Sequence, residues 1–139
     1  NDLKVEGYLQ AMSEHGLEPK VIQVPGKIGA HEKHYKELLE NEHPDVAIVV
    51  RDSMAVSFIN VARNLHIHIP EELQVIGFQN TKYAELSRPT LTCINTPIYE
   101  IGEEAMNLLT ELMESEEDIE DTKKLVDYDI IRRESTRNN

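Results

Sequence analysis

Apolar residues along this chain follow two spacings, which predict an ordered series of helices and strands. Spacings of three to four residues predict helices, and short continuous apolar runs predict strands. The predicted helices cover residues 5–16, 31–42, 55–65 and 98–113. The predicted strands cover residues 20–24, 45–50, 73–78, 90–95 and 124–131.

This alternation of helix and strand predicts an α/β fold, with a mainly parallel sheet flanked by helices. The run DVAIVV at 45–50 is apolar throughout, as in a parallel strand that is covered on both faces. The acidic stretch ESEEDIEDT at 114–122 is expected to be a solvated loop.

Polar or turn-forming residues follow three of the predicted strands. They are Pro25 to Lys27, Arg51 with Asp52, and Gln79 with Asn80. Ligands of parallel α/β sheets bind beyond the carboxyl ends of the strands, so these positions form a candidate binding site. A simpler interpretation of Asp52 is that it, or Ser53, caps the following helix. The sequence leaves both interpretations open.

Composition narrows the class of protein. The chain has 139 residues, 40% of them hydrophobic, and a formal charge of −12, which repels nucleic-acid phosphates. These residues are therefore not expected to bind DNA on their own. No apolar run is long enough for a membrane span and no secretory signal is visible, so a cytoplasmic location is expected. Cys93 is the single cysteine, and its apolar neighbours predict an inert buried thiol.

The chemical motifs are weak. PGKIG at 25–29 lacks the rest of a phosphate-binding loop, and HEKH at 31–34 is not the HExxH zinc motif. HIHIP at 66–70 offers two histidines without a third ligand. No GxSxG is present, and the acidic pair of a receiver domain is missing. We expect no metal, no cofactor and no enzymatic activity.

From Lys4 to Thr136 the chain resembles the C-terminal part of the lac-repressor/gal-repressor family of bacterial transcription regulators. The matching pieces occur in the order and spacing of that family: KVEGY to HGL (4–17), VRDSMA (50–55), IPEELQVIGFQNT (69–81), RPTLTCINTPIYEIGEEA (88–105) and IIRREST (130–136). The REST ending favours the regulators over the related periplasmic sugar-binding proteins.

The resemblance implies the second lobe of a periplasmic-binding-protein-like fold, formed by residues 1–97 and 123–135. The helix at 98–115 is expected to pack on an N-terminal lobe that is missing here. The helix-turn-helix DNA-binding domain of the family is also absent from this chain. Operator DNA would be contacted only through that domain. The implied function is the effector-sensing, dimerising part of a sugar-responsive repressor.

The resemblance also implies an effector site in a cleft between two lobes. Lys4 matches a position that is usually arginine, and Arg51 and Asp52 match a pair whose first member is commonly small and polar. Gln79 matches a position that is commonly aspartate. With Asn80 and Lys27 from the other strand ends, these are the candidate effector-binding residues.

Arginine at position 51 and a neutral amide at position 79 make the candidate site more positive than is usual in the family. They suggest a sugar phosphate rather than a neutral sugar, with Arg51 binding the anion. Alternatively, Arg51 pairs with Asp52 or with another local carboxylate.

Further partners follow from the same resemblance. TPIYEIG is similar to a stretch of catabolite control proteins, which bind a serine-phosphorylated phosphocarrier protein. The basic residues they use correspond here to Asn107 and Glu111, so a phosphocarrier corepressor is not expected. Val56, Asn60 and Leu86 are candidate contacts of a homodimer, with ordinary local packing as the alternative.

Two other functions stay open. The first is a periplasmic sugar-binding protein of a transporter, which an upstream signal peptide would support. The second is a stand-alone flavodoxin-like enzyme or signalling domain, which a cooperatively folding monomer of this chain would support.

Overall fold

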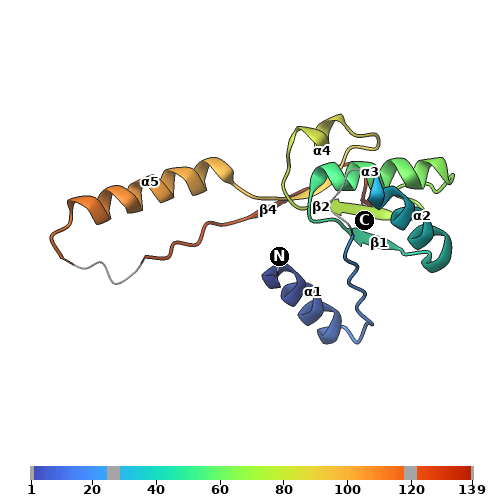
Figure 1. Cartoon of the computed structure of the whole chain (residues 1–139), viewed down its shortest axis with the longest axis horizontal. Helices are drawn as coiled ribbons and strands as arrows, with labels where there is room; N and C mark the ends of the chain where they lie inside the picture. Colours follow the sequence, from blue (N-terminus) through green and yellow to red (C-terminus); the bar gives the residue numbers. More distant parts are fainter. Residues whose placement is uncertain (1, 25–28, 118–121, 139) are drawn as a thin grey trace.

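The computed structural model describes residues 2–24, 29–117 and 122–138 and contains five helices and four strands in this part of the chain (Figure 1). In order along the chain they are α1 (Asp2–Glu14), α2 (Ala30–Glu42), β1 (Val46–Ile48), α3 (Asp52–Asn64), β2 (Gln74–Gly77), α4 (Lys82–Leu86), β3 (Thr92–Asn95), α5 (Ile98–Glu114) and β4 (Asp129–Ile131). Helix and strand alternate from α2 to β4, whereas α1 is followed directly by α2. The short helix α4 was not predicted.

The four strands form one sheet in the order β1-β2-β3-β4. Strands β1, β2 and β3 are parallel, whereas β4 pairs antiparallel with β3. Val46 lies opposite Gln74, and Ile76 lies opposite Thr92. The predicted α/β fold with a mainly parallel sheet is therefore confirmed, and the carboxyl ends of three strands lie at one edge.

The core lies between the sheet and helices α2 and α3. Its buried members are apolar side chains from both helices, from α4, from β2 and β3 and from the connecting loops: Tyr35, Leu39, Ala55, Phe58, Ile59, Ala62, Leu73, Val75, Ala84, Leu91 and Cys93. The rings of Tyr35 and Phe58 pack edge to face with their centroids 5.2 Å apart. This layer fixes the position of α3 against β2.

The opposite face of the sheet is more open than the sequence suggested. Val46 and Ile48 of β1 are each 46% exposed, so the prediction of a strand covered on both faces is wrong. Helix α1 has no buried residue and does not seal this face. A continuous apolar run predicts a strand that can be covered on both faces, but it does not show whether a helix covers each face.

The predicted strand at 20–24 is not formed. Val21 and Ile22 are 49% and 44% exposed. The backbone N–H of Lys20 donates to the hydroxyl of Tyr8 at 3.0 Å, and the Lys20 ammonium pairs with Glu42. A β-branched run becomes a strand only when a neighbouring strand accepts its hydrogen bonds, and here the local partners come from helices. Likewise, only Asp129–Ile131 of the predicted strand at 124–131 pairs with the sheet.

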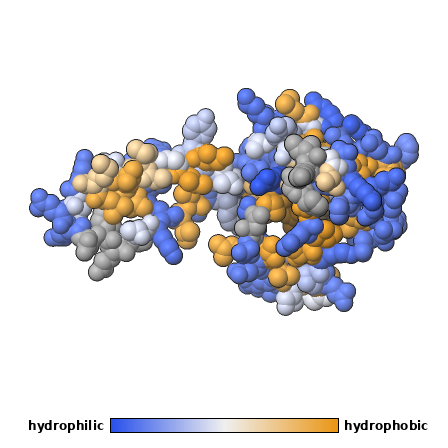
Figure 2. Space-filling view, in the orientation of Figure 1, coloured by the Kyte–Doolittle hydropathy of each residue, from blue (hydrophilic) through white to orange (hydrophobic). Residues whose placement is uncertain are grey.

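Helix α5 and the segment that returns from it form an arm that extends away from the sheet (Figure 1). None of the 17 residues of α5 is buried. Apolar side chains gather on the arm in Figure 2, and the exposed ones of α5 are Ile98, Tyr99, Ile101, Met106, Leu109, Leu112 and Met113. Helix α5 therefore presents an apolar surface that no described part of the chain buries.

The C-terminal segment is fastened to the sheet by Ser135. Its side chain is fully buried; the hydroxyl donates to the carbonyl of Val75 at 2.5 Å and accepts from the N–H of Thr92 at 2.8 Å. Its backbone also bonds to Thr90 and to Val75. Ser135 therefore bridges Val75 of β2 and Thr92, the first residue of β3.

Candidate functional site

Asp52 organises the edge of the sheet where β1 and β2 end. Its carboxylate is fully buried; one oxygen accepts from the backbone N–H and the hydroxyl of Thr81 at 2.6 and 2.9 Å. The other oxygen accepts from the backbone N–H of Gln79 at 3.3 Å. Asp52 thus fastens the loop after β2 to the beginning of α3.

The helix-capping interpretation of Asp52 is wrong. Arg51 occupies the cap position, and no side-chain hydrogen bond caps the helix there. The backbone N–H of Asp52 donates instead to the side-chain oxygen of Gln79 at 3.4 Å. Asp52 and Gln79 therefore contact each other twice, once through each backbone N–H.

Gly77 makes room for the buried carboxylate. A Cβ at this position would lie 2.6 Å from an Asp52 oxygen, 2.7 Å from Leu91 and 3.0 Å from the sulfur of Cys93. Any larger residue would displace one of these groups. The glycine of the IGF sequence is thus explained by packing beside Asp52.

Cys93 lies under the same carboxylate. Its thiol is fully buried and points to an Asp52 oxygen at 3.6 Å. Burial, and then the negative charge of Asp52, raise the pKa of the Cys93 thiol to about 11. The thiol stays protonated and unreactive near neutral pH, which confirms the predicted inert buried cysteine.

Asn80 belongs to a polar network that the sequence did not reveal. Its backbone has a positive φ of 58°, which asparagine tolerates. Its amide donates to Asn95 at 3.1 Å and accepts from Arg133 at 2.7 Å. Asn95 in turn donates to Asp129 at 2.7 Å. The network links the ends of β2, β3 and β4, and its members come from positions up to 53 residues apart.

Lys4 reaches this edge from α1. Its ammonium nitrogen lies 4.4 Å from the centroid of the Phe78 ring, which directly precedes Gln79. A cation over an aromatic face is attracted by the ring quadrupole. The first turn of α1 is therefore held near the end of β2.

Arg51 lies three residues beyond the end of β1, at the N-cap of α3, and its side chain is exposed. The parallel pairing of β1 with β2 ends at Ile48 and Ile76. Beyond it, the backbone N–H of Asp52, the neighbour of Arg51, donates to the side-chain oxygen of Gln79 at 3.4 Å. Within residues 2–24, 29–117 and 122–138, the Arg51 side chain has no hydrogen-bond or ion-pair partner. The remaining candidate, Lys27, lies outside the described residues.

The structure thus brings five candidate residues to one edge of the sheet: Lys4, Arg51, Asp52, Gln79 and Asn80. Their side chains differ in availability. Arg51 and Gln79 are exposed, whereas Asp52 is buried and the Asn80 amide is engaged by Asn95 and Arg133. We call this group, with Phe78, the strand-end rim.

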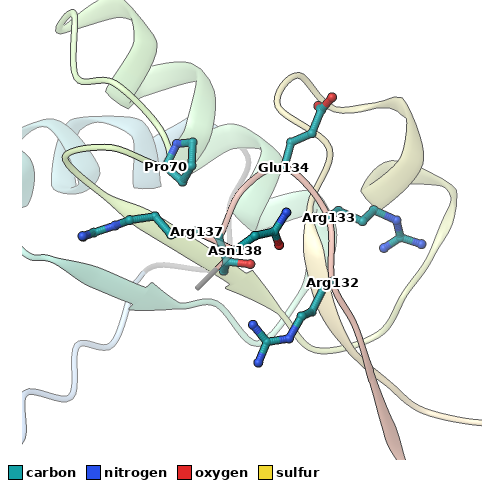
Figure 3. Close-up of a pocket in the computed structure, with 7 residues that line it drawn as sticks. Pro70, Arg132, Arg133, Glu134, Arg137 and Asn138 are labelled. Carbon is teal, nitrogen blue, oxygen red and sulfur yellow. The ribbon is translucent and has the colours of Figure 1, made fainter.

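The opposite end of the sheet carries a different surface feature. A depression of about 680 Å³ is lined by Pro70 and by residues 132–138, most visibly Arg132, Arg133 and Arg137 (Figure 3). These residues follow β4, which runs antiparallel to β3, so the depression lies near the beginnings of the parallel strands. Arg133 lines this depression and also donates to Asn80 of the strand-end rim, so this residue links the two features.

The described residues contain no cluster of three or more histidine, cysteine or acidic side chains that could hold a metal ion. In the same ranges, no helix is both long and apolar enough to cross a membrane. The candidate dimer residues lie on α3 and α4: Val56 is half-buried, Asn60 is exposed, and Leu86 is 74% exposed.

Comparison with known proteins identifies the class that this parallel sheet and its strand-end rim define. Residues 1–136 match the periplasmic binding protein-like domain, and the chain belongs to that family. Among its relatives, catabolite control protein A of Priestia megaterium is 35% identical over 117 residues, covering 81% of this chain and 35% of the relative. The HTH-type transcriptional repressor CytR of Escherichia coli strain K12 is 33% identical over 138 residues, covering 96% of this chain and 40% of the relative.

A solved structure agrees with this assignment. The periplasmic binding protein/LacI transcriptional regulator of Alkaliphilus metalliredigens QYMF, complexed with D-xylulofuranose, superposes with a TM-score of 0.83 at 25% identity. The superposition covers 99% of this chain and 52% of that chain. The resemblance to lac-repressor-type regulators is confirmed, and the chain spans roughly half or less of the length of the proteins it matches.

Proposed function

We propose that this chain is the effector-sensing and dimerising part of a sugar-responsive bacterial transcription repressor. The observation that carries the proposal is the strand-end rim, in which buried Asp52 holds the exposed side chain of Gln79 at the carboxyl ends of β1 and β2. The sequence relatives named above are transcription regulators, and a related structure holds a sugar.

The chemistry of the rim suits reversible binding of a polyhydroxylated molecule. The Gln79 amide can both donate to and accept from a hydroxyl group. Asp52 acts as a support, because its buried oxygens fix the backbone at Gln79 and Thr81. The proposed function makes and breaks no covalent bond and uses no cofactor.

The α5 arm extends this proposal to the rest of the molecule. We propose that residues 98–115 pack on a first lobe of the same fold, with residues 1–97 and 123–135 forming the second lobe. The exposed side chains of Ile101, Leu109 and Leu112 are 42%, 49% and 41% accessible, which suits such an interface. The effector would then lie between the strand-end rim and that lobe.

Signalling follows from the two-lobed arrangement. An effector that contacts both lobes favours the arrangement in which those contacts form. By linkage, effector binding and operator binding then change each other's affinity by the same factor. Operator DNA would be contacted by a separate DNA-binding domain, because the charge of −12 disfavours contact with phosphates here.

Dimerisation is proposed through Val56 and Asn60 of α3 together with Leu86 of α4. The two helices pack against each other, so the three residues can belong to one surface. A cytoplasmic location agrees with a DNA-linked function. A phosphocarrier corepressor is not proposed, because Asn107 and Glu111 offer no positive charge to a phosphate.

The function is tested by calorimetric titration of the intact protein with a panel of common aldoses, ketoses and their phosphates. We expect one of them to bind, and Gln79→Ala to weaken its binding by roughly 10-fold, which corresponds to one lost hydrogen bond. Asn64→Ala, an exposed amide at the last residue of α3, whose first residue is Asp52, is the matched control. Failure of every sugar to bind, or equal affinity in both variants, would contradict the proposal.

A further inference from the structure

The arginine at the strand-end rim has no counter-ion in the described part of the chain. Pairing of Arg51 with Asp52 was the simplest expectation for adjacent opposite charges. It does not occur, because the Asp52 side chain turns inward and its oxygens bind Gln79, Thr81 and Cys93. Arg51 remains exposed, and no other described carboxylate lies within ion-pair distance.

The other cations near the rim are already engaged. The ammonium group of Lys4 lies over the ring of Phe78. Arg133 donates to the carbonyl of Leu91 and to Asn80, and it lies 3.8 Å from Glu85. Arg51 is thus the guanidinium group of the rim whose donors are available to a ligand.

The residue beside Arg51 is neutral. Gln79, whose side-chain oxygen accepts from the backbone N–H of Asp52 next to Arg51, offers an amide in which oxygen and nitrogen are both uncharged. A carboxylate there would repel an anion and neutralise Arg51. An amide does neither and can still bind hydroxyl groups. In a chain with a net charge of −12, an uncompensated arginine beside a neutral amide marks a local preference for anions.

We infer that the effector of this protein is an anionic sugar, whose phosphate or carboxylate group is bound by Arg51 while its hydroxyl groups contact Gln79. The inference rests on the proposed function and names the chemical class of its ligand. The planar guanidinium group presents paired donors whose spacing matches two oxygens of a phosphate or a carboxylate.

The basic depression at the other end of the sheet is the competing anion site. Figure 3 shows that the side chains of Arg132, Arg133 and Arg137 point in different directions and do not converge on one point. Glu134 also lines this depression and adds a negative charge. The depression therefore provides a control for the experiment, because Arg137 is exposed as Arg51 is but lies at the far end of the strands.

The test is a calorimetric comparison of matched ligands on the intact protein. Glucose, glucose 6-phosphate and glucuronate share a ring and differ only in the group on carbon 6. Ribose with ribose 5-phosphate and fructose with fructose 6-phosphate extend the comparison, and inorganic phosphate is titrated alone. Each ligand is measured with the wild type, Arg51→Gln, Arg51→Lys and Arg137→Gln.

We expect at least one anionic sugar to bind about 10-fold or more tightly than its neutral partner, and inorganic phosphate to bind weakly. Arg51→Gln should remove roughly 10- to 100-fold of the affinity for the anion and leave neutral sugars unaffected. Arg51→Lys should retain part of the affinity, because it keeps the charge but loses the paired donors. Arg137→Gln should bind as the wild type does.

Each contrary result has a definite meaning. A neutral sugar that binds as tightly as its anionic partner would overturn the inference and leave the proposed function standing. Anion binding that survives Arg51→Gln, or that is lost in Arg137→Gln, would also overturn the inference and would place the anion elsewhere. Absence of binding by every sugar and by phosphate would overturn the inference and the proposed function together.

Discussion

The carboxylate of Asp52 accepts both the backbone N–H and the hydroxyl of Thr81, at 2.6 and 2.9 Å. The two residues are 29 positions apart in the sequence and follow different strands. Together they determine where the loop after β2 begins to turn into α4. Gln79 is held by the same carboxylate, because its backbone N–H donates to the other Asp52 oxygen at 3.3 Å.

Asp52→Ala is therefore expected to reduce the free energy of unfolding by about 3 kcal/mol, because buried N–H groups lose a charged acceptor. Thr81→Val, which removes only the hydroxyl, should cost about 1 kcal/mol. Urea denaturation followed by circular dichroism measures both values. An Asp52→Ala variant as stable as the wild type would show that the carboxylate does not hold the loop.

Gly77→Ala should destabilise the fold by about 1 to 3 kcal/mol, because the added Cβ would overlap an Asp52 oxygen and Leu91. Gly102→Ala is the matched control. It lies in helix α5 with no atom within 4 Å of the new Cβ, so it should be neutral or stabilising by up to about 1 kcal/mol. Thermal unfolding of the two variants measures the difference, and equal melting temperatures would contradict the close packing at Gly77.

Ser135→Ala should cost about 1 to 3 kcal/mol, because the carbonyl of Val75 and the N–H of Thr92 would both lose a partner in a buried setting. Ser13→Ala on the exposed surface of α1 provides the same chemical change without burial. Hydrogen exchange at the amide of Thr92 gives a local measurement. Unchanged protection of that amide in Ser135→Ala would show that the serine does not bridge the strands.

Cys93 predicts a dependence of stability on alkaline pH. The folded protein keeps the thiol protonated up to a pKa of about 11, whereas the unfolded thiol ionises near 9.0. Between these values the folded state binds more protons, so its free energy of unfolding should fall as the pH rises, by about 3 kcal/mol in total.

The Cys93 contribution is isolated by comparison with Cys93→Ala, which should lack this fall between pH 9 and pH 11. At pH 8 the thiol should react with a thiol reagent only after denaturant is added. Rapid labelling of the folded protein at pH 8 would contradict the burial of Cys93.

The α5 arm predicts a surface effect without loss of stability. Replacing Leu109 and Leu112 with lysine should change the free energy of unfolding of this chain by less than about 0.5 kcal/mol, because both side chains are exposed. The same change should lower the binding of the dye ANS, which reports exposed apolar surface. Leu39→Ala in the core should instead cost about 2 to 5 kcal/mol. A comparable loss in the lysine variant would show that α5 is packed.

The sequence predicted the strands that became β1, β2 and β3 and the helices that became α2, α3 and α5. Their signals are local, because helical and strand spacing repeat within a few residues. It did not predict the fate of residues 20–24, whose β-branched composition suits a strand but whose neighbours come from α1 and α2. The short helix α4 was missed, because five residues are too few to show a period.

The candidate site shows the same division. The strand-end rule located Arg51, Asp52 and Gln79 at one edge of the sheet, and the family resemblance added Lys4. The contacts of Asp52 differ from those that its neighbours in the sequence suggested. Asp52 neither caps α3 nor pairs with Arg51, since its partners at 79 and 81 lie on another strand end. Arg133, Asn95 and Asp129 could not be found from the sequence, because nothing local marks them as neighbours of Asn80.

The amino-acid sequence alone determined most of the helical and extended segments, that polar groups follow the ends of strands, and that the chain resembles sugar-responsive regulators. Only the tertiary structure decided which of these polar groups are buried supports and which are exposed to a ligand. The physical reason is that a side chain's availability depends on partners brought together by folding, from 27 residues away for Asp52 and Gln79 to 60 for Ser135 and Val75.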